Sequence, residues 1–327
     1  MSKPPRQQQL FGDSEEEPAV LPATVGEDLV TLASRLPKSL RLGTSSWSFP
    51  GWRGIVYAPG SRSQQLARHG LQAYAQHPLL RAVSVDRTFY GPLQAQDFAA
   101  YAAAVPGDFR FLVKAMAHCT SPITPSHGNR TREPNPHYLD ESFAIDRVIA
   151  PAVEGLGELL GTMLFQFPPQ QAAITKKPEH FAERLSDFLG ALPRGLNYAV
   201  ELRDAALMTQ AYFDALATAG AHHCYSIHPR MPSIARQREL APDSGPVFAR
   251  WMLQPPLNYQ QAKEQFTPFA NLSAEDPGRR GQLQDLCTDA IRKGADVMVT
   301  VNNKAEGSAP LSIFALAKAI ASALEGR

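Results

Sequence analysis

Short apolar runs of strand type alternate with longer segments of helical period along most of this chain. Eight such runs recur after residue 39, many of them rich in β-branched or aromatic residues. They are Leu40–Trp47, Ala82–Phe89, Phe109–Ala115, Thr162–Phe167, Asn197–Arg203, Ala221–Ile227, Val247–Met252 and Val297–Asn302. Alternating βα units wind a parallel sheet, and eight of them predict an α/β fold of the (β/α)8 TIM-barrel type.

The segments between these runs carry the helical pattern. Helices are expected at Gln64–Ala75, Gln94–Val105, Asp140–Leu160, Pro178–Ala191, Met208–Ala219, Asp276–Gly294 and Leu311–Leu324. The sixth connection, Pro229–Ser244, has the weakest helical pattern. Long irregular loops follow the third and seventh runs, at His118–His137 and Gln254–Ala274, and loops of this length are usually functional.

Length and end composition suggest how the chain is divided. Its 327 residues fit a single barrel, so we expect one domain over residues 25–327, with a helix at 25–36 and the barrel at 40–325. Residues 1–24 are rich in Pro, Gln and Glu and poor in apolar residues, which predicts a disordered tail.

Composition narrows the class of protein. There are 32 Lys and Arg against 31 Asp and Glu, so no overall positive field favours nucleic acid. The three cysteines are far apart, which argues against a disulfide framework. The sequence begins without a signal-peptide pattern and has no run of membrane-spanning length, so a cytoplasmic protein without membrane association is expected. The sequence does not indicate an oligomeric state.

Reactive side chains gather at the predicted carboxyl ends of the strands, where TIM barrels carry their active sites. Because strand side chains alternate in direction, Glu201 and Arg203 are expected to point into the barrel. A buried charge needs a partner, and Lys114 and Arg250 on other strands are the natural candidates. We therefore predict Glu201 and Lys114 as catalytic residues. The alternative is a purely structural ion network.

Further polar and aromatic residues at the strand ends are predicted to bind substrate. Together with Arg203 and Arg250 they are Trp47, Asp86, Tyr90, Gln166, His228, Asn302 and Asn303. Two alternatives stay open: the Asn pair could form a turn, and the aromatic residues could pack the rim. His222 and His223 lie at the start of their strand and are expected to be structural or solvent-facing.

The sequence does not demand a cofactor. No glycine-rich nucleotide-binding loop is present, and the cofactor is left unassigned. A divalent ion held by Glu201, His228 and Asp86 is conceivable but not favoured, and so is one held by the loop histidines His118, His127 and His137. Arg130 and Arg132 could grip a phosphate, although a solvated loop is the commoner reason for such residues.

Several strand-end strings resemble a known family. GTSSWSFPGWRGIVY, TFY, FLVKA, FQFPP, YAVELR and VNN are similar to motifs of the YecE-like family, domain of unknown function 72, from about Arg41 to about Ala323. The resemblance implies a TIM barrel and no established activity. The family's motif residues fall on Trp47, Trp52, Thr88, Phe89, Tyr90, Lys114, Gln166, Glu201, Arg203, Asn302 and Asn303.

Two positions depart from the family pattern. Such proteins commonly carry an acidic residue, and two positions later an Asn, before TFY, whereas this chain has Ser84 and Asp86. The family's arginine, leucine, histidine, glycine string is replaced by Arg250 followed by Trp251, Met252 and Leu253. Ser84 therefore cannot supply a carboxylate.

Three functional hypotheses follow. The first is an enzyme that acts on a small anionic or phosphorylated polar substrate by acid/base chemistry, as a hydrolase or an isomerase. The second is a nucleic-acid-binding or nuclease-like barrel, which rests on analogy between folds. The third is a barrel that binds a ligand without turning it over.

Overall fold

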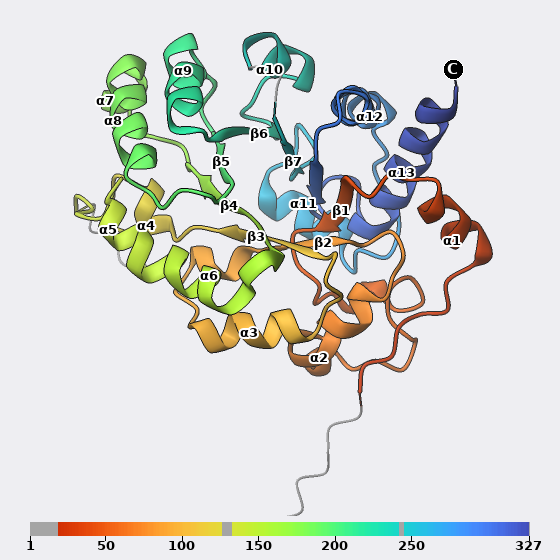
Figure 1. Cartoon of the computed structure of the whole chain (residues 1–327). Helices are drawn as coiled ribbons and strands as arrows, with labels where there is room; N and C mark the ends of the chain where they lie inside the picture. Colours follow the sequence, from red (N-terminus) through yellow and green to blue (C-terminus); the bar gives the residue numbers. More distant parts are fainter. Residues whose placement is uncertain (1–18, 126–132, 242–244, 327) are drawn as a thin grey trace, which may run out of the picture.

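The computed structural model describes residues 19–125, 133–241 and 245–326. Eight parallel strands close into one barrel in sequence order, and helices surround it (Figure 1). The strands are β1 (Leu40–Thr44), β2 (Ala82–Val85), β3 (Arg110–Lys114), β4 (Leu160–Gln166), β5 (Tyr198–Glu201), β6 (His222–Ile227), β7 (Val247–Trp251) and β8 (Val297–Val301). The barrel closes where β1 pairs with β8, with Leu40 opposite Val297. The predicted TIM barrel is confirmed.

Most strands end earlier than predicted because the chain turns out of the sheet at the site. The predicted run Ala82–Phe89 is a strand only to Val85, after which a 3-10 turn, η2 (Asp86–Phe89), begins. The Thr88 hydroxyl lies 2.6 Å from the carbonyl oxygen of Val85 and 2.5 Å from that of Lys114. This one side chain ties the end of β2 to the end of β3.

The main helices are α1 (Glu27–Ser34), α2 (Ser63–Ala75), α3 (Ala95–Ala103), α6 (Ala150–Leu156), α8 (Pro178–Gly190), α9 (Gln210–Ala219), α10 (Ile234–Leu240), α11 (Tyr259–Phe266), α12 (Pro277–Arg292) and α13 (Ala309–Glu325). Short helices are α4 (Ala117–Thr120), α5 (Glu141–Ala144) and α7 (Ala172–Thr175). Single 3-10 turns are η1 (Pro50–Trp52), η4 (Gly157–Leu159) and η5 (Ala205–Leu207).

The predicted helix Asp140–Leu160 is broken rather than continuous. Its middle is a π-helical turn, η3 (Ile145–Ile149), between α5 and α6. Pro151 follows at the start of α6, and proline has no backbone N–H to continue a regular helical ladder. The helix predicted weakest, in the sixth connection, is the short α10. The loop Gln254–Ala274 contains α11, which its polar sequence did not reveal.

The N-terminal segment packs against the barrel before α1 begins. Residues 1–18 lie outside the described part of the chain, but Val20 and Ala23 are buried, and the Ala23 N–H donates to the Val56 carbonyl at 2.9 Å. Part of the predicted tail 1–24 is therefore structured. Helix α1 occupies most of the predicted span 25–36, and Arg35 at its end pairs with Glu325 of α13.

The barrel interior is layered. A ring of apolar side chains fills its middle, comprising Ala82, Leu112, Leu164, Ala199, Cys224, Phe248 and Met298. The outward faces of the strands pack on the helices. Gly43 of β1 leaves space for the neighbouring strand, because a Cβ there would lie 1.9 Å from the Ala82 carbonyl oxygen. Beyond this ring, towards the carboxyl ends of the strands, the inward-facing side chains are polar.

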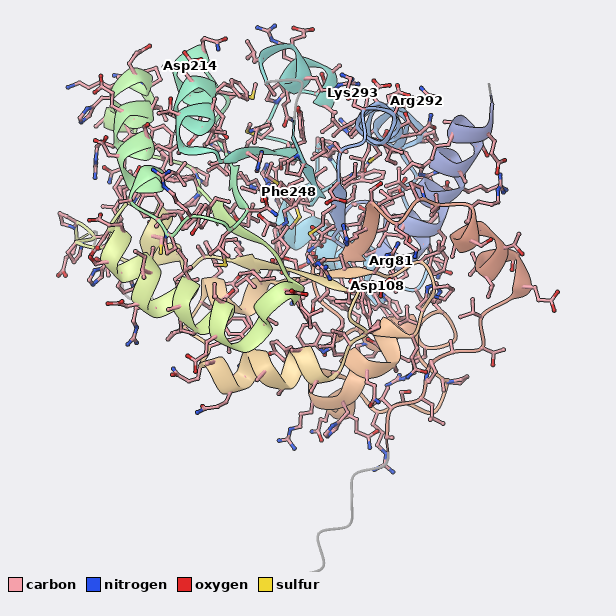
Figure 2. The ribbon with its side chains drawn as sticks, viewed as in Figure 1. Arg81, Asp108, Asp214, Phe248, Arg292 and Lys293 are labelled. Atoms are coloured by element: carbon pink, nitrogen blue, oxygen red, sulfur yellow. The ribbon has the colours of Figure 1, made fainter. Side chains whose placement is uncertain are left out.

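The amino-terminal ends of the strands carry stabilising contacts. Arg81 and Asp108, which precede β2 and β3, form an ion pair of 2.8 Å (Figure 2). His223 is buried between the Tyr212 hydroxyl at 2.9 Å and the Gln237 amide oxygen at 3.1 Å, and burial lowers its pKa to about 4. His223 is therefore a neutral structural residue. No described helix is long and apolar enough to cross a membrane.

Candidate functional site

A layer of polar side chains lies above the apolar ring, one from most of the strands. Each lies two residues beyond a member of the apolar ring, so strand alternation directs it to the same face. The layer consists of Ser84, Lys114, Gln166, Glu201, Ser226, Arg250 and Thr300, and all of these side chains are buried. This layer stands at the carboxyl ends of the strands, where barrels of this type keep their active sites.

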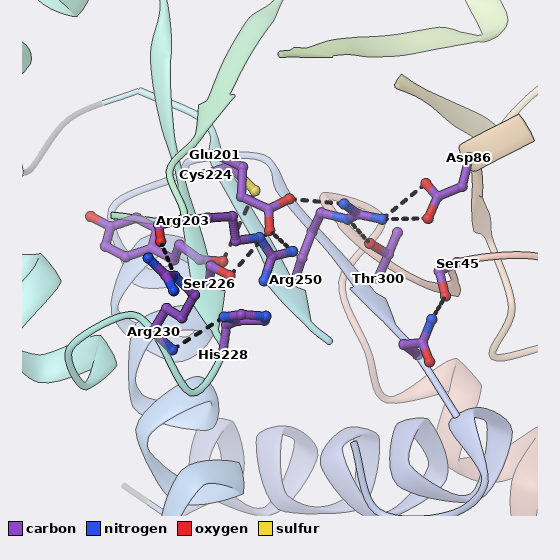
Figure 3. A network of polar contacts seen from close by, with 12 residues as sticks. Ser45, Asp86, Glu201, Arg203, Cys224, Ser226, His228, Arg230, Arg250 and Thr300 are labelled. Atoms are coloured by element: carbon purple, nitrogen blue, oxygen red, sulfur yellow. Dashed lines mark hydrogen bonds and ion pairs between the residues drawn. The ribbon is translucent and has the colours of Figure 1, made fainter. Parts of the chain in front are cut away.

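Glu201 lies at the centre of an ion network (Figure 3). One carboxylate oxygen pairs with Arg203 and accepts the Ser226 hydroxyl at 3.2 Å. The other oxygen accepts the Arg250 guanidinium at 2.8 Å. Glu201 is fully buried, and its two oxygens are engaged by these three partners. The predicted pairing with Arg250 is thus present, and Arg203 is the second cationic partner instead of Lys114.

Arg250 crosses the barrel to a second carboxylate. Its Nη2 lies 2.9 Å from both oxygens of Asp86, and its Nε lies 3.4 Å from the Thr300 hydroxyl. The Ser84 hydroxyl donates to Asp86 at 2.5 Å. Ser84 therefore helps to orient the Asp86 carboxylate that pairs with Arg250.

The network fixes the charges of its members. Burial alone would raise the pKa of Glu201, but Arg203 and Arg250 outweigh burial and lower it to about 2. Burial opposes the charge of Arg250, but Asp86 and Glu201 raise its pKa above the ordinary value. Both groups are fully ionised at neutral pH, and neither exchanges protons readily.

Lys114 belongs to the same layer but has a different environment. Its Nζ lies 3.6 Å from the centroid of the Phe89 ring, and within the described residues it makes no hydrogen bond or ion pair. Burial lowers the pKa of Lys114 to about 8; Asp86 opposes this effect and Arg250 adds to it. With a pKa of about 8, about one tenth of this amine is unprotonated at pH 7.

His228 follows β6 at the edge of the network. Its Nδ1 accepts the Arg230 backbone N–H at 3.2 Å, and the Arg230 side chain pairs with Asp204 at 2.8 Å. Burial, with help from Arg203, lowers the pKa of His228 to about 4. This imidazole is neutral at physiological pH, and its Nε2 carries the proton because Nδ1 is an acceptor.

Lys304, beyond the end of β8, is a second buried lysine that our prediction of site residues omitted. Its Nζ lies 4.1 Å from the centroid of Tyr259 and 5.5 Å from that of Phe269. Tyr90 and Tyr259 are both largely exposed, and burial, Tyr259 and Asp86 together raise the pKa of Tyr90. The only sequence signal for Lys304 was its position directly after Asn302 and Asn303.

The two asparagines are held by the protein itself. The Asn302 amide donates to the Ser45 hydroxyl at 2.8 Å and its oxygen accepts the Lys304 N–H at 3.0 Å. The Asn303 oxygen accepts the Trp52 indole N–H at 3.1 Å and the Ala309 N–H at 2.8 Å. These contacts hold the turn between β8 and α13. Both groups of the Asn302 amide and the oxygen of Asn303 are thereby engaged, whereas the buried Asn303 amide nitrogen has no hydrogen-bond partner among the described residues.

The remaining predicted residues lie around the network without joining it. Gln166 is buried in register with Glu201, and within the described residues its amide forms no hydrogen bond. Trp47 is buried, with its ring 5.1 Å from that of Tyr101. Gln166 thus offers a free amide to the site, whereas Trp47 packs the wall.

The candidate metal ligands do not converge. Within the described residues no three His, Cys, Asp or Glu side chains are placed to share an ion. Asp86 and Glu201 both form ion pairs with Arg250. His137 stacks on Phe143 and pairs with Asp140 at 3.1 Å. His127, Arg130 and Arg132, which were considered for a metal or a phosphate but not favoured, lie outside the described residues.

One cavity among the described residues reaches His228, at the edge of the network. This cavity of about 330 Å³ is lined by His228, Met231, Asp276 and Arg279 among others, between the end of β6 and the start of α12. A larger cavity of about 850 Å³ lies at the opposite end, around the starts of β6 and β7. The smaller cavity is the one at the end of the barrel where chemistry is expected.

Comparison with known proteins agrees with this architecture. The family model for a protein of unknown function, DUF72, matches residues 41–326. The chain belongs to the DUF72 family. A DUF72 protein from Thermotoga maritima, solved by crystallography, is 18% identical and has a TM-score of 0.56, with 85% of this chain and 98% of that chain covered.

A second DUF72 structure, from Enterococcus faecalis, is 17% identical with a TM-score of 0.52, over 87% of this chain and 97% of that one. No curated protein matches the chain. At these identities the solved DUF72 structures establish the barrel and no activity. The function must be argued from the polar layer itself.

Proposed function

We propose that this protein is an enzyme that acts on a small anionic polar molecule at the carboxyl end of the barrel, with Lys114 as its proton carrier. One observation carries the proposal: Lys114 lies in a buried ion network but has no carboxylate partner. Burial lowers the pKa of Lys114 to about 8, so this lysine can exchange its proton close to neutral pH, as acid/base catalysis requires.

The balance of charge favours an anion. The network and the adjoining end of β8 contain four cations, Arg203, Arg250, Lys114 and Lys304, against the two carboxylates of Glu201 and Asp86. Two positive charges are left over in a mostly buried region. A phosphate or carboxylate group would neutralise them, and its cost of desolvation would be offset by those charges.

Glu201 is better suited to positioning than to proton transfer. With a pKa of about 2 and contacts to Arg203, Arg250 and Ser226, it is a very weak base at neutral pH. Loss of the Glu201 carboxylate would remove a charge partner from the buried Arg203 and Arg250 at the same time. Glu201 therefore holds the cations that face the substrate, while Lys114 exchanges the proton.

Neutral His228 adds a hydrogen-bond donor at the boundary with the 330 Å³ cavity, and the free Gln166 amide adds a second one. Together with an amine that titrates near neutrality, these donors suit proton abstraction beside a carbonyl or activation of water. Isomerisation and hydrolysis are the reaction types that use such a set.

The three cysteines are all unpaired and buried, which supports the proposed cytoplasmic location.

The proposal is tested by thermal-shift measurements on the full chain against inorganic phosphate, sugar phosphates, small carboxylates and short DNA. Wild type is compared with Lys114→Met and Lys304→Met, and Lys318→Met on the exposed face of α13 is the control. A ligand at about one hundred times its Kd stabilises the native state by about 2.7 kcal/mol, a rise of several degrees. The small anions should raise the Tm of wild type and control but not of the other two variants.

Two results would contradict the proposal. The first is an absence of any shift with small anions, combined with salt-dependent DNA binding that Lys114→Met retains, which would move the function to a nucleic-acid surface. The second is an anion that binds at Lys114 and is recovered unchanged together with every co-substrate tested. That result would make the protein a binding module.

A further inference from the structure

Lys114 combines burial, a reduced proton affinity and an unoccupied amine, which is more than a positioning role requires. We propose that Lys114 is a nucleophile that forms an imine with the carbonyl group of a small anionic aldehyde or ketone. This inference rests on the proposed function and deepens it, because it names the substrate class. It also changes the role of Lys114 from exchanging a proton to forming a covalent bond.

The fold holds this amine in a fixed place. Thr88 contacts the carbonyl oxygen of Lys114 at 2.5 Å and so anchors the end of β3 to the turn η2. The same turn carries Phe89, whose ring covers the Lys114 Nζ at 3.6 Å. Burial disfavours the ammonium form and Arg250 adds to this effect, while Asp86 and Glu201 oppose it. Lysines that form imines are commonly activated by such desolvation.

The other potential nucleophiles of the polar layer are occupied or protonated. The Ser226 hydroxyl donates to Glu201, and both carboxylates are bound to arginines. Cys224 lies below the layer, fully buried, and burial raises the pKa of its thiol well above the ordinary value. Among the described residues of the layer, Lys114 is therefore the side chain with a lone pair available for attack.

The covalent step is balanced without a further reagent. The lone pair of the neutral Nζ forms a bond to the carbonyl carbon, and the electrons of the C=O π bond move to oxygen. A proton passes from nitrogen to that oxygen, giving a carbinolamine. Loss of the oxygen as water, together with the remaining proton of nitrogen, leaves the imine, and addition of water reverses the sequence.

The substrate must carry an anionic group close to its carbonyl. Arg250 lies in the same layer as Lys114, and Arg203 pairs with Glu201 beside it. With Lys114 neutral, the cations Arg203, Arg250 and Lys304 exceed the carboxylates Glu201 and Asp86 by one positive charge, which the substrate would neutralise. A three- or four-carbon keto acid, or a short sugar phosphate with a free carbonyl group, has both features. An uncharged carbonyl compound of equal size would lack the attraction of the arginines.

The test is reductive trapping on the intact protein. Wild type is incubated with pyruvate, with dihydroxyacetone phosphate or with uncharged dihydroxyacetone, and each sample is treated with sodium cyanoborohydride. Intact mass gives the number of adducts, and peptide mapping identifies the modified lysine directly, so the result does not depend on the folding of a variant. Lys114→Arg, which keeps the charge but loses the nucleophile, and Lys318→Met are treated in parallel.

The inference predicts one adduct on Lys114 with an anionic probe, formed at least about tenfold faster than with dihydroxyacetone and absent from Lys114→Arg. The tenfold figure corresponds to about 1.4 kcal/mol of charge-assisted binding. An equal rate with the uncharged probe, or labelling spread over surface lysines, would overturn it. If small anions raise the Tm through Lys114 but no adduct forms on that residue, the imine is wrong and the proposed function still stands.

Discussion

Arg250 and Asp86 meet across the mouth of the barrel, with one guanidinium nitrogen 2.9 Å from both carboxylate oxygens. Arg250 comes from β7 and Asp86 from the turn after β2, so the contact joins distant strands. The opposite edge of the same guanidinium contacts Glu201 at 2.8 Å. Arg250 therefore bridges two carboxylates, and Lys114 is left without one.

The two carboxylates should differ in their importance for stability. Glu201→Gln removes a fully buried charge that serves Arg203 and Arg250, and we expect it to cost about 3–5 kcal/mol of unfolding free energy. Asp86→Asn is expected to cost only about 1–3 kcal/mol, since Asp86 is partly exposed and Arg250 keeps Glu201. Urea denaturation of both variants checks the order, and an equal or reversed order would show that Glu201 is not the centre of the network.

The carboxylate that pairs with Arg250 should be transferable along β2. Ser84 points into the barrel from β2 and donates to Asp86 in the turn that follows, so Ser84→Glu combined with Asp86→Asn would return a carboxylate to this position. We expect the double variant to recover most of the stability lost in Asp86→Asn. The urea midpoint is the measurement, and a double variant no more stable than Asp86→Asn alone would contradict this reading of the site.

Acid should weaken the protein through Glu201. Its pKa is about 2 in the folded protein against an ordinary 4.5, so the folded state holds fewer protons than the unfolded state between these values. The stabilisation is complete above pH 4.5 and is lost as the pH falls towards 2, by about 3 kcal/mol in total. The stability difference between wild type and Glu201→Gln should shrink over that range. A constant difference would mean that Glu201 does not titrate as described.

Lys114 should give the opposite behaviour at alkaline pH. Its pKa is lowered to about 8 from an ordinary 10.5, so below pH 8 the buried ammonium carries its full penalty. As the pH rises from 8 to 10.5 the folded state releases its proton first, and stability should rise by about 3 kcal/mol relative to Lys114→Met. Denaturation at several pH values across this window checks the sign. Parallel curves for the two proteins would contradict it.

The sequence predicted the barrel well because its signals are local. Strand alternation placed Glu201 inside the barrel, and the eight apolar runs contain or overlap all eight strands. Helix α11 was missed because it is short and mostly polar, and its buried face consists of only Ala262 and Phe266. Strand ends were overestimated because the predicted run Ala82–Phe89 extended through the polar residues Asp86, Arg87 and Thr88, where the chain leaves the sheet in the turn η2.

The pairing within the site could not be predicted in the same way. Which side chains meet depends on the stagger of eight strands and on turns between residues far apart in sequence. Arg250 and Asp86 are 164 positions apart, and Lys114 was expected to pair with Glu201 on the basis of charge alone. Asn303 was predicted to bind substrate, but its oxygen holds Trp52 and the start of α13, a contact that no local pattern indicates.

The most direct test is a titration of the Lys114 amine by NMR, with lysine labelled with ¹³C at Cε and the resonance assigned by its absence in Lys114→Arg. The account predicts a midpoint near pH 8, which rises when a small phosphate-bearing ligand binds. A midpoint at the ordinary value of 10.5, unchanged by any small anion, would show that Lys114 is not the reactive group of this site.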